Sequence, residues 1–318
     1  PPIEFPYISY DGLYWWQDVR DKVFAGNYKA SSLDRFFIGE IGHEFVGSVL
    51  CNSSAQTKSL GLVEFVWTEP QHRQKGIMTH LLDALIKNFG HEGGKMLHLC
   101  TSNPAAAALY RNAGFVHHIG DGLRYLYPGN ESFDETYLAY NGPATIREGN
   151  FGDMAGFAAL HNNPSLDWFV HYYIPWFERR VFDSFRFEGH YRKFITDAEH
   201  GSGHVLVLEN KLGRIVAGVG LSEAPSYYEQ HVKVMNLACS PTYFAELQKL
   251  IAAAIAYAEK DGTEIIDVYV VDSELSKIKI LEKVGFKEAT RLKNHIKLPG
   301  GENTDFVIYT HELNPARL

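Results

Sequence analysis

The sequence predicts an α/β fold with mixed sheets, built from two similar units that follow one another along the chain. The first observation is the length of 318 residues, which favours two domains of roughly 150 residues each. The second is an internal repeat, because short segments of the first half recur at a constant offset of 171. The third is that alternating apolar residues give way to apolar residues at helical spacing in each half.

The repeat is carried by short matching segments in the same order. Val46-Gly47 in the first half corresponds to Ala217-Gly218 in the second, and Gly114-Phe115 corresponds to Gly285-Phe286. We therefore expect two copies of one α/β unit.

The boundary between the units is expected in a stretch rich in turn residues, 127–142. This stretch is expected to hold the last strand of the first unit and the linker. We place the boundary near Gly142, which gives a first unit of residues 1–142 and a second unit of residues 143–318.

Before that last strand, the first half is expected to contain four strands and two helices. Apolar alternation predicts strands at 35–41, 44–50, 61–68 and 95–101. Ile77, Leu81, Leu85 and Phe89 recur at helical spacing, and Gly90 is expected to end that helix in a left-handed conformation. Asn103 is expected to cap a second helix that Pro104 opens and Gly114 closes.

The second half is expected to repeat this order. Its predicted strands are 204–209, 214–221, 232–239 and 264–271, its first predicted helix is 243–260, and its second predicted helix ends at 284–285. The aromatic stretch 168–191 is expected to belong to early helices of this unit and to serve core and inter-domain packing.

Composition and charge exclude several classes of protein. Thirty Lys and Arg against thirty-eight Asp and Glu give a formal charge of −8, which disfavours a nucleic-acid partner. No apolar run approaches the ~20 residues that span a bilayer, and the start lacks the pattern of a signal peptide. The three cysteines have no CxxC spacing, and His117-His118 would point to opposite faces of a strand. We expect a cytoplasmic protein without a membrane partner and without a metal.

The most informative segment lies between the third predicted strand and the first predicted helix. It contains Arg73, Lys75 and Gly76 directly before the helix. A helix start exposes unpaired N–H groups and a partial positive charge, so this arrangement is typical of a pyrophosphate site. The alternative is that the basic residues are ordinary solvated side chains.

The second informative segment is 103–115, NPAAAALYRNAGF. By itself it is a short capped helix, and Tyr110 on it would be an ordinary core aromatic.

Together the two segments resemble the GNAT superfamily of acyl-CoA-dependent N-acetyltransferases. The family's pyrophosphate cradle has the pattern Arg/Gln-x-x-Gly-x-Gly/Ala, and residues 73–77 match it, while Met78 replaces the final small residue. The family's later helix has Asn-x-x-Ala-x-x-Leu-Tyr followed by Gly-Phe, and Asn103, Ala106, Leu109, Tyr110, Gly114 and Phe115 stand at those spacings.

The resemblance implies two tandem GNAT-like units and a role for each matched residue. The main chain from Val66 to Thr68 would bind the pantetheine arm of acetyl-CoA, and Asn103 would contact that arm. Tyr110 would be the general acid for the departing thiolate. Glu64 is a candidate base acting through water, with a surface or hairpin-paired carboxylate as the alternative. The residues that would hold the pyrophosphate are Arg73, Gln74, Lys75, Gly76, Ile77, Met78 and Thr79.

The second copy has lost these groups. At the offset of 171 the cradle residues become Phe244, Glu246 and Leu247, so a pyrophosphate would meet an acidic residue and no glycine. The counterparts of Asn103, Tyr110 and Glu64 are Glu274, Leu281 and Met235. We expect this unit to be catalytically silent, to stabilise the first unit and to form part of the acceptor pocket.

The expected function is transfer of an acetyl group from acetyl-CoA to a primary amine by direct attack. The acceptor is a small-molecule or peptide amine that the sequence does not identify, and the oligomeric state stays open. Two alternatives remain: transfer of another acyl group or to another acceptor, and a non-catalytic acyl-CoA sensor whose second unit binds a partner protein.

Overall fold

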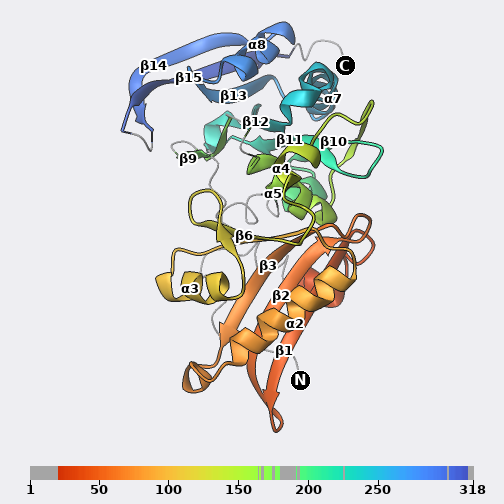
Figure 1. The fold of residues 1–318 in the computed structure, drawn as a ribbon. Coiled ribbons are helices and arrows are strands. Elements are labelled where there is room, and N and C mark those ends of the chain that lie inside the picture. Colours follow the sequence, from red (N-terminus) through yellow and green to blue (C-terminus); the bar gives the residue numbers. More distant parts are fainter. Residues whose placement is uncertain are drawn as a thin grey trace.

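A computed structural model of the chain describes residues 21–163, 165, 168–173, 176–179, 191, 194–224, 226–298 and 301–313. Figure 1 shows two large sheets, one formed mainly by the first half of the chain and one by the second half. No helix among these residues is long and apolar enough to cross a membrane.

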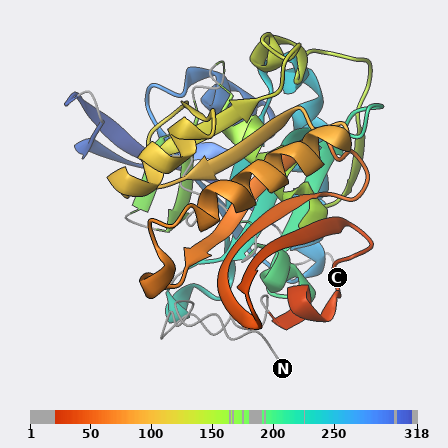
Figure 2. The ribbon, with the colours of Figure 1, turned by 60° about the horizontal axis from the view of Figure 1, so that its bottom comes forward.

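The first sheet contains the four strands expected in this half and two further strands. The strands lie in the sheet in the order β1-β2-β3-β4-β6-β5. β3 and β4 are parallel, and the other neighbouring strands are antiparallel. β1 and β2 curve together (Figure 2) and are joined by a turn in which Gly42 has φ 68°. The strands are β1 (Ser32–Ile41), β2 (Glu44–Ser54), β3 (Leu60–Thr68), β4 (Met96–Cys100), β5 (Val116–His117) and β6 (Gly122–Leu126).

Two helices cover one face of this sheet, α2 (Ile77–His91) and α3 (Pro104–Asn112). α2 buries its predicted apolar stripe, including Leu81, Leu85 and Phe89, in one cluster with Tyr110 of α3 and with side chains of the sheet. Full burial of such a side chain contributes about 1.5–3 kcal/mol, so the stripe fixes α2 on the sheet.

The prediction that Gly90 ends α2 is wrong. α2 continues to His91, and the glycine with positive φ beyond it is Gly93, at φ 89°. Gly90 is needed for packing, because a Cβ there would lie 2.7 Å from Cε1 of Tyr127. At the second helix the predictions are confirmed: Asn103 caps α3, Pro104 opens it and Gly114 follows it at φ 98°.

The second sheet has the space order β14-β15-β13-β12-β11-β10-β7. β12 and β13 are parallel, and the other neighbours are antiparallel. Its helices are α7 (Phe244–Lys260) and α8 (Leu275–Lys283). The strands are β7 (Thr145–Glu148), β10 (His204–Glu209), β11 (Ile215–Glu223), β12 (Val232–Cys239), β13 (Ile265–Val271), β14 (Lys287–Lys297) and β15 (Asn303–Glu312).

The two sheets correspond strand by strand. The order β5-β6-β4-β3-β2-β1 matches the order β14-β15-β13-β12-β11-β10, and β7 is an additional edge strand. The single parallel pair has the same place in both sheets. α3 and α8 begin and end at the offset of the sequence repeat, as do the short 3-10 helices η1 (Pro70–His72) and η4 (Pro241–Tyr243).

The connection between the sheets differs from the prediction for 127–142. The last strand of the first sheet, β6, already ends at Leu126, and the connection contains a short helix, α4 (Phe133–Thr136), in place of a strand. The start of α7 holds this connection by side-chain hydrogen bonds. Leu138 O accepts from Ser240 Oγ (3.1 Å) and Thr242 Oγ1 (2.9 Å), and Tyr243 OH and Glu246 Oε2 accept from the backbone N–H groups of Asn141 (3.0 Å) and Ala144 (2.8 Å).

Helix α5 (Met154–His161) lies between the two sheets (Figure 1). It contacts β2 and β3 on one side and β11 and β12 on the other. Its small residues Ala155, Ala158 and Ala159 are buried, and they belong to one hydrophobic cluster that includes side chains of both sheets. The two halves therefore share a core through this helix.

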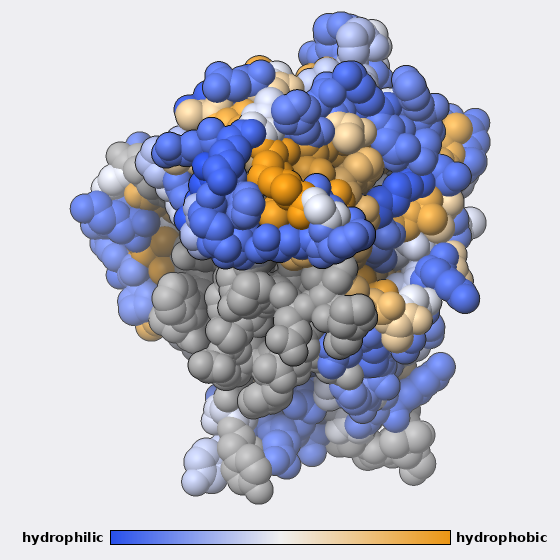
Figure 3. All heavy atoms as spheres, turned by 90° about the horizontal axis from the view of Figure 1, so that it is seen from below, coloured by the Kyte–Doolittle hydropathy of each residue, from blue (hydrophilic) through white to orange (hydrophobic). Residues whose placement is uncertain are grey.

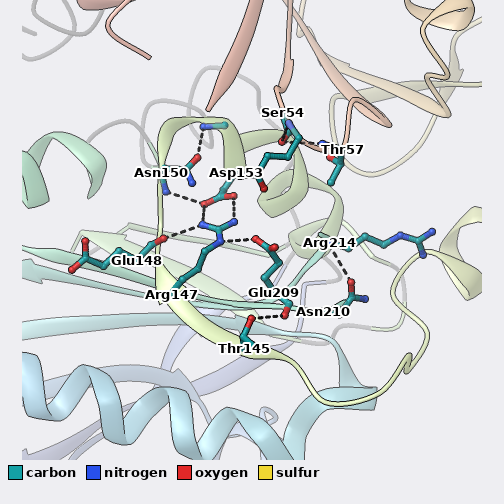
Figure 4. A network of polar contacts seen from close by, with 12 residues as sticks. Ser54, Thr57, Thr145, Arg147, Glu148, Asn150, Asp153, Glu209, Asn210 and Arg214 are labelled. Carbon is teal, nitrogen blue, oxygen red and sulfur yellow. Dashed lines mark hydrogen bonds and ion pairs between the residues drawn. The ribbon is translucent and has the colours of Figure 1, made fainter. Parts of the chain in front are cut away.

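Arg147 fixes the segment that leads into α5 (Figure 4). Its guanidinium donates to both carboxylate oxygens of Asp153, at 2.6 and 2.8 Å, and to Glu209 Oε2 at 2.5 Å. Burial alone lowers the pKa of Arg147, but the hydrogen bonds and charges of Asp153 and Glu209 outweigh it and raise the pKa. Asp153 also accepts the N–H of Asn150 at 2.9 Å, so the cation ties β7 and β10 to the turn η2 (Phe151–Asp153) before α5.

The prediction of early helices in 168–191 is wrong for residues 169–173 and 176–179. β8 (Phe169–Tyr173) and β9 (Trp176–Arg179) pair as an antiparallel hairpin. β-branched and aromatic residues favour strands, and aromatic content alone does not distinguish a buried helix from a strand. Tyr191, at the end of the stretch, is helical, and residues 174–175 and 180–190 lie outside the described residues.

Candidate functional site

The predicted cradle is a turn in which the chain leaves β3 and enters α2. Arg73 ends η1, and its Nε donates to the carbonyl oxygen of Thr68 at 3.1 Å. Gln74 and Gly76 then take the left-handed conformation, at φ 61° and 80°. Glycine adopts this region without strain, which explains why Gly76 stands at the helix start.

The start of α2 has no side-chain cap. Gly76 is its N-cap residue, and the first backbone bond of the helix runs from the N–H of His80 to Gly76 O at 3.1 Å. The N–H groups of Ile77, Met78 and Thr79 therefore have no carbonyl partner within the helix. They coincide with the positive end of the dipole of a 15-residue helix.

The side chains around these N–H groups divide into two sets. Arg73, Lys75 and Thr79 are exposed, so two cations are available beside the helix start. Met78 is buried in the cluster beneath α2, which keeps its larger side chain away from the exposed turn. The departure from the small residue of the GNAT pattern is thus accommodated in the core.

The parallel strands β3 and β4 separate next to this turn. They pair only from Leu60 opposite Met96 to Leu62 opposite His98, and β3 then continues to Thr68. Within the described residues no strand pairs with this edge of β3 beyond Leu62. The backbone groups from Val66 to Thr68 on that edge are therefore placed to bind an extended ligand.

A β-bulge accompanies the separation. The pairing of β2 with β3 shifts between Ser48 and Leu50, so that Phe65 and Val66 oppose Val49 alone, and Phe65 has φ 48°. A phenylalanine at positive φ is unusual. No sequence signal marks this bulge, because β3 has no glycine there.

Tyr110 lies in the cluster that joins α2, α3 and the sheet. Its side chain is 5 % exposed, and its ring meets that of Phe115 edge-on at 5.9 Å. Val66 and Ile77 pack against the same cluster. The structure thus brings the end of β3, the first turn of α2 and Tyr110 together.

Asn103 has a local role at the start of α3. Its Oδ1 accepts the N–H groups of Ala105 (2.9 Å) and Ala106 (3.4 Å), and the residue is exposed.

Glu64 lies on the opposite face of the sheet from the cradle. The pairing from Gly61 to Glu64 is regular, so the side chain of Glu64 shares a face with that of Leu62, which packs in the cluster around α5. The carboxylate is 7 % exposed. Glu64 can therefore act only on a group that reaches the gap between β3 and β4 from that face.

His98 is a buried residue at this gap that the sequence analysis did not select. It is the last residue of β4 that pairs with β3, and burial lowers its pKa to about 3, with smaller contributions from His118 and Arg124. The imidazole is therefore neutral near pH 7. Among the described residues no group of three His, Cys, Asp or Glu side chains is arranged to hold a metal ion.

The counterpart positions in the second sheet have other contacts. Phe244, in place of Arg73, stacks on Trp168 with ring centroids 5.0 Å apart and planes within 1°. The indole Nε1 of Trp168 donates to Ser276 Oγ at 2.8 Å, and Trp168 is 1 % exposed. Trp168 therefore lies between the starts of α7 and α8.

The remaining counterparts are buried. Leu247, Met235 and Leu281 belong to the core, and Glu274 is buried in an ion pair with Lys277 at 3.2 Å. The pairing of β11 with β12 runs without a register shift, so this sheet has no bulge at the place of Phe65. The exposed cations and the glycine of the first site have no equivalent here.

An uncapped helix start with two exposed cations, beside parallel strands that separate, is suited to a phosphate-bearing co-substrate with an extended arm. The chain was compared with known protein families. The model of the acetyltransferase (GNAT) family matches residues 5–115, about a third of the chain. No curated protein matches the chain.

The solved structures that match the chain are distant in sequence. A GNAT-superfamily phosphinothricin acetyltransferase from Sinorhizobium meliloti, in complex with acetyl-CoA, is 14% identical, with a TM-score of 0.47 over 54% of this chain and 90% of that chain. A ribosomal-protein-alanine N-acetyltransferase from Brucella melitensis is 16% identical, with a TM-score of 0.44 over 53% and 99% of the two chains. A GNAT-family acetyltransferase from Streptococcus pneumoniae is 17% identical, with a TM-score of 0.44 over 54% and 99%.

Proposed function

We propose that the first unit, residues 1–142, transfers the acetyl group of acetyl-CoA to a primary amine. The observation that carries the proposal is the convergence of three elements: the uncapped start of α2, the open edge of β3 and Tyr110 of α3. Each matches one part of the co-substrate, namely the pyrophosphate, the pantetheine arm and the leaving sulfur.

Binding depends on the cradle and the open strand edge. The N–H groups of Ile77, Met78 and Thr79, with Arg73 and Lys75 nearby, hold the pyrophosphate. The main chain from Val66 to Thr68 continues as the partner of the pantetheine amides. In this pose Asn103 contacts the arm from the start of α3.

The reaction is a direct attack without a covalent enzyme intermediate. The amine nitrogen attacks the thioester carbonyl carbon, the carbon–sulfur bond breaks, and Tyr110 donates its phenolic proton to the leaving thiolate. An alkyl amine has a pKa of ~10.4, so its neutral form costs roughly 4–5 kcal/mol at pH 7. Glu64, acting through water, offsets part of this cost by accepting the amine proton.

The second unit, residues 143–318, is proposed to be a degenerate GNAT-like unit with a structural role. The equal strand order of the two sheets and the common helix offset support this. Phe244 and Glu246 are engaged with Trp168 and with the N–H of Ala144, so the positions that would bind a pyrophosphate serve packing.

The test combines calorimetry with a turnover assay. Acetyl-CoA should bind once per chain, and Arg73→Ala should raise its dissociation constant by roughly 10- to 100-fold, since charge-assisted contacts contribute about 1.5–3 kcal/mol. Phe244→Ala is the matched control and should leave the constant unchanged. Two equivalent sites per chain would contradict the proposal. Binding without release of free thiol across a broad amine panel would favour the acyl-CoA sensor instead.

A further inference from the structure

The face of the first sheet that carries Glu64 also carries a group of aromatic rings. Phe36 of β1 lies with its ring centroid 6.2 Å from that of Phe65 on β3, and it stacks on Phe24 at 5.4 Å. Phe45 and Trp67 stack at 5.3 Å with planes 11° apart. We call these five residues the aromatic patch.

The bulge in β3 places this patch beside the carboxylate. Val66 packs toward α2, so its neighbours Phe65 and Trp67 point to the other face. Glu64 points to that face as well, because the extra residue of the bulge interrupts the alternation of the strand. Two successive side chains, a carboxylate and a phenyl ring, therefore lie on the same side of the strand at the gap.

On β1 the same face is defined by alternation. Phe37 packs in the cluster under α2, and a Cβ on Gly39 would lie 3.2 Å from Ile77 of α2, so Phe36 and Ile38 face away from the helix. Ile38 is 41 % exposed and Phe24 is 47 % exposed. Figure 3 views the molecule from the end where α2 begins and shows hydrophobic residues in a hollow bordered by hydrophilic ones. The patch itself is defined by the ring contacts given above.

The acceptor must approach from this face. In the proposed function the coenzyme occupies the face with α2 and α3, and its thioester reaches the gap between β3 and β4. A nucleophile attacks the carbonyl carbon from the side that the coenzyme leaves open, which is the side of Glu64 and the patch. On this side of the gap lie partly exposed aromatic rings and the carboxylate of Glu64, which is 7 % exposed.

We infer that the acceptor is a primary amine carried on an aromatic body. This inference rests on the proposed function and specifies its substrate class. The carboxylate of Glu64 attracts the ammonium form, and the rings bind the apolar body by burial and stacking. An amino sugar would place several hydroxyls against phenyl rings, which costs free energy unless each finds a partner. A polyamine has no ring or other large apolar body to bury against the patch.

Turnover by the parent protein tests the inference directly. The kcat/KM for 2-phenylethylamine should be at least about tenfold higher than that for n-propylamine, spermidine or glucosamine. This is the scale of discrimination expected from burying a phenyl ring. A preference for spermidine or glucosamine would overturn the inference and leave the proposed function intact. Failure of acetyl-CoA to bind would overturn both.

Two further measurements separate the patch from general folding effects. 2-Phenylethanol, which has the ring but no amine, should inhibit competitively against the amine and not against acetyl-CoA. Phe36→Ala should raise KM for 2-phenylethylamine several-fold more than it raises KM for n-propylamine. Tyr140→Ala is the control: it removes an aromatic ring that is 56 % exposed and lies outside the first sheet, and it should change neither KM. The inference would be contradicted if 2-phenylethanol did not inhibit. It would also be contradicted if Phe36→Ala raised KM equally for the two amines.

Discussion

Replacing Trp168 by alanine should destabilise the protein strongly and leave acetyl-CoA binding unchanged. The indole is 1 % exposed, stacks on Phe244 and donates a hydrogen bond to Ser276. Its removal leaves a hole between α7 and α8 that the surrounding helices can fill only in part. The cradle is the turn before α2, whereas the contacts that the structure describes for this indole are with α7 and α8.

The expected magnitude follows from the size of the side chain. Truncation of a fully buried Trp costs about 3–5 kcal/mol, including the cavity that remains. At about 2.1 cal/mol/K per residue, a chain of 318 residues that unfolds as one unit loses roughly 1.5 °C of its unfolding midpoint per kcal/mol. The midpoint should therefore fall by roughly 4–8 °C. Because a dry apolar cavity can take up a small aromatic molecule, free indole should restore part of the loss in the variant and none in the parent.

The assay is thermal unfolding with and without indole, joined to calorimetry with acetyl-CoA. Tyr140→Ala is the control, since it removes a ring that is 56 % exposed and should lower the midpoint by far less. If Trp168→Ala lowered the free energy of unfolding by less than about 1 kcal/mol, the indole would not be an important packing contact between α7 and α8. A changed dissociation constant for acetyl-CoA would refute the independence of the two sites.

The remaining predictions concern the first sheet. Tyr110→Phe keeps the ring and removes the proton, so it should fold and bind acetyl-CoA normally and lose on the order of 10²–10⁴ in turnover; parental turnover would reject the acid role. Glu64→Gln should lower kcat/KM near pH 7 and progressively less toward pH 10, where the amine is already neutral, whereas a loss that is equal at every pH would indicate an orienting role. The pKa of His98 is about 3 in the folded protein and about 6.5 in the unfolded chain. Between these two pH values each unit of acidification therefore lowers the free energy of unfolding by about 1.4 kcal/mol. His98→Asn should flatten that pH dependence in denaturant titrations, and identical slopes for parent and variant would exclude His98 as its source.

Local signals in the sequence predicted much of the fold. The strands at 204–209 and 232–239 have the predicted bounds, and the Asn103 cap was readable because capping involves only neighbouring residues. The cradle could be proposed for the same reason, since a glycine and cations before a helix are consecutive in the chain.

Features that depend on distant partners could not be predicted. Gly90 is required by the ring of Tyr127, and the bulge at Phe65 is set by the register of β3 against β2. Trp168 acquires its role from partners in α7 and α8, far along the chain. The face on which Glu64 lies follows from alternation, but the rings on that face come from Phe36 and Phe24, which are distant from Glu64 in the sequence.

Helix α5 also determines how the protein can be divided. It belongs to the second half of the sequence, yet it covers the side chains of Leu60, Leu62 and Met96 in the first sheet. A fragment ending at Gly142 would lack this helix and present those three side chains to water, at a cost of about 1.5–3 kcal/mol each. Catalytic studies of an isolated first half should therefore retain the chain at least through His161, and the two halves are better regarded as a single cooperative unit than as separable modules.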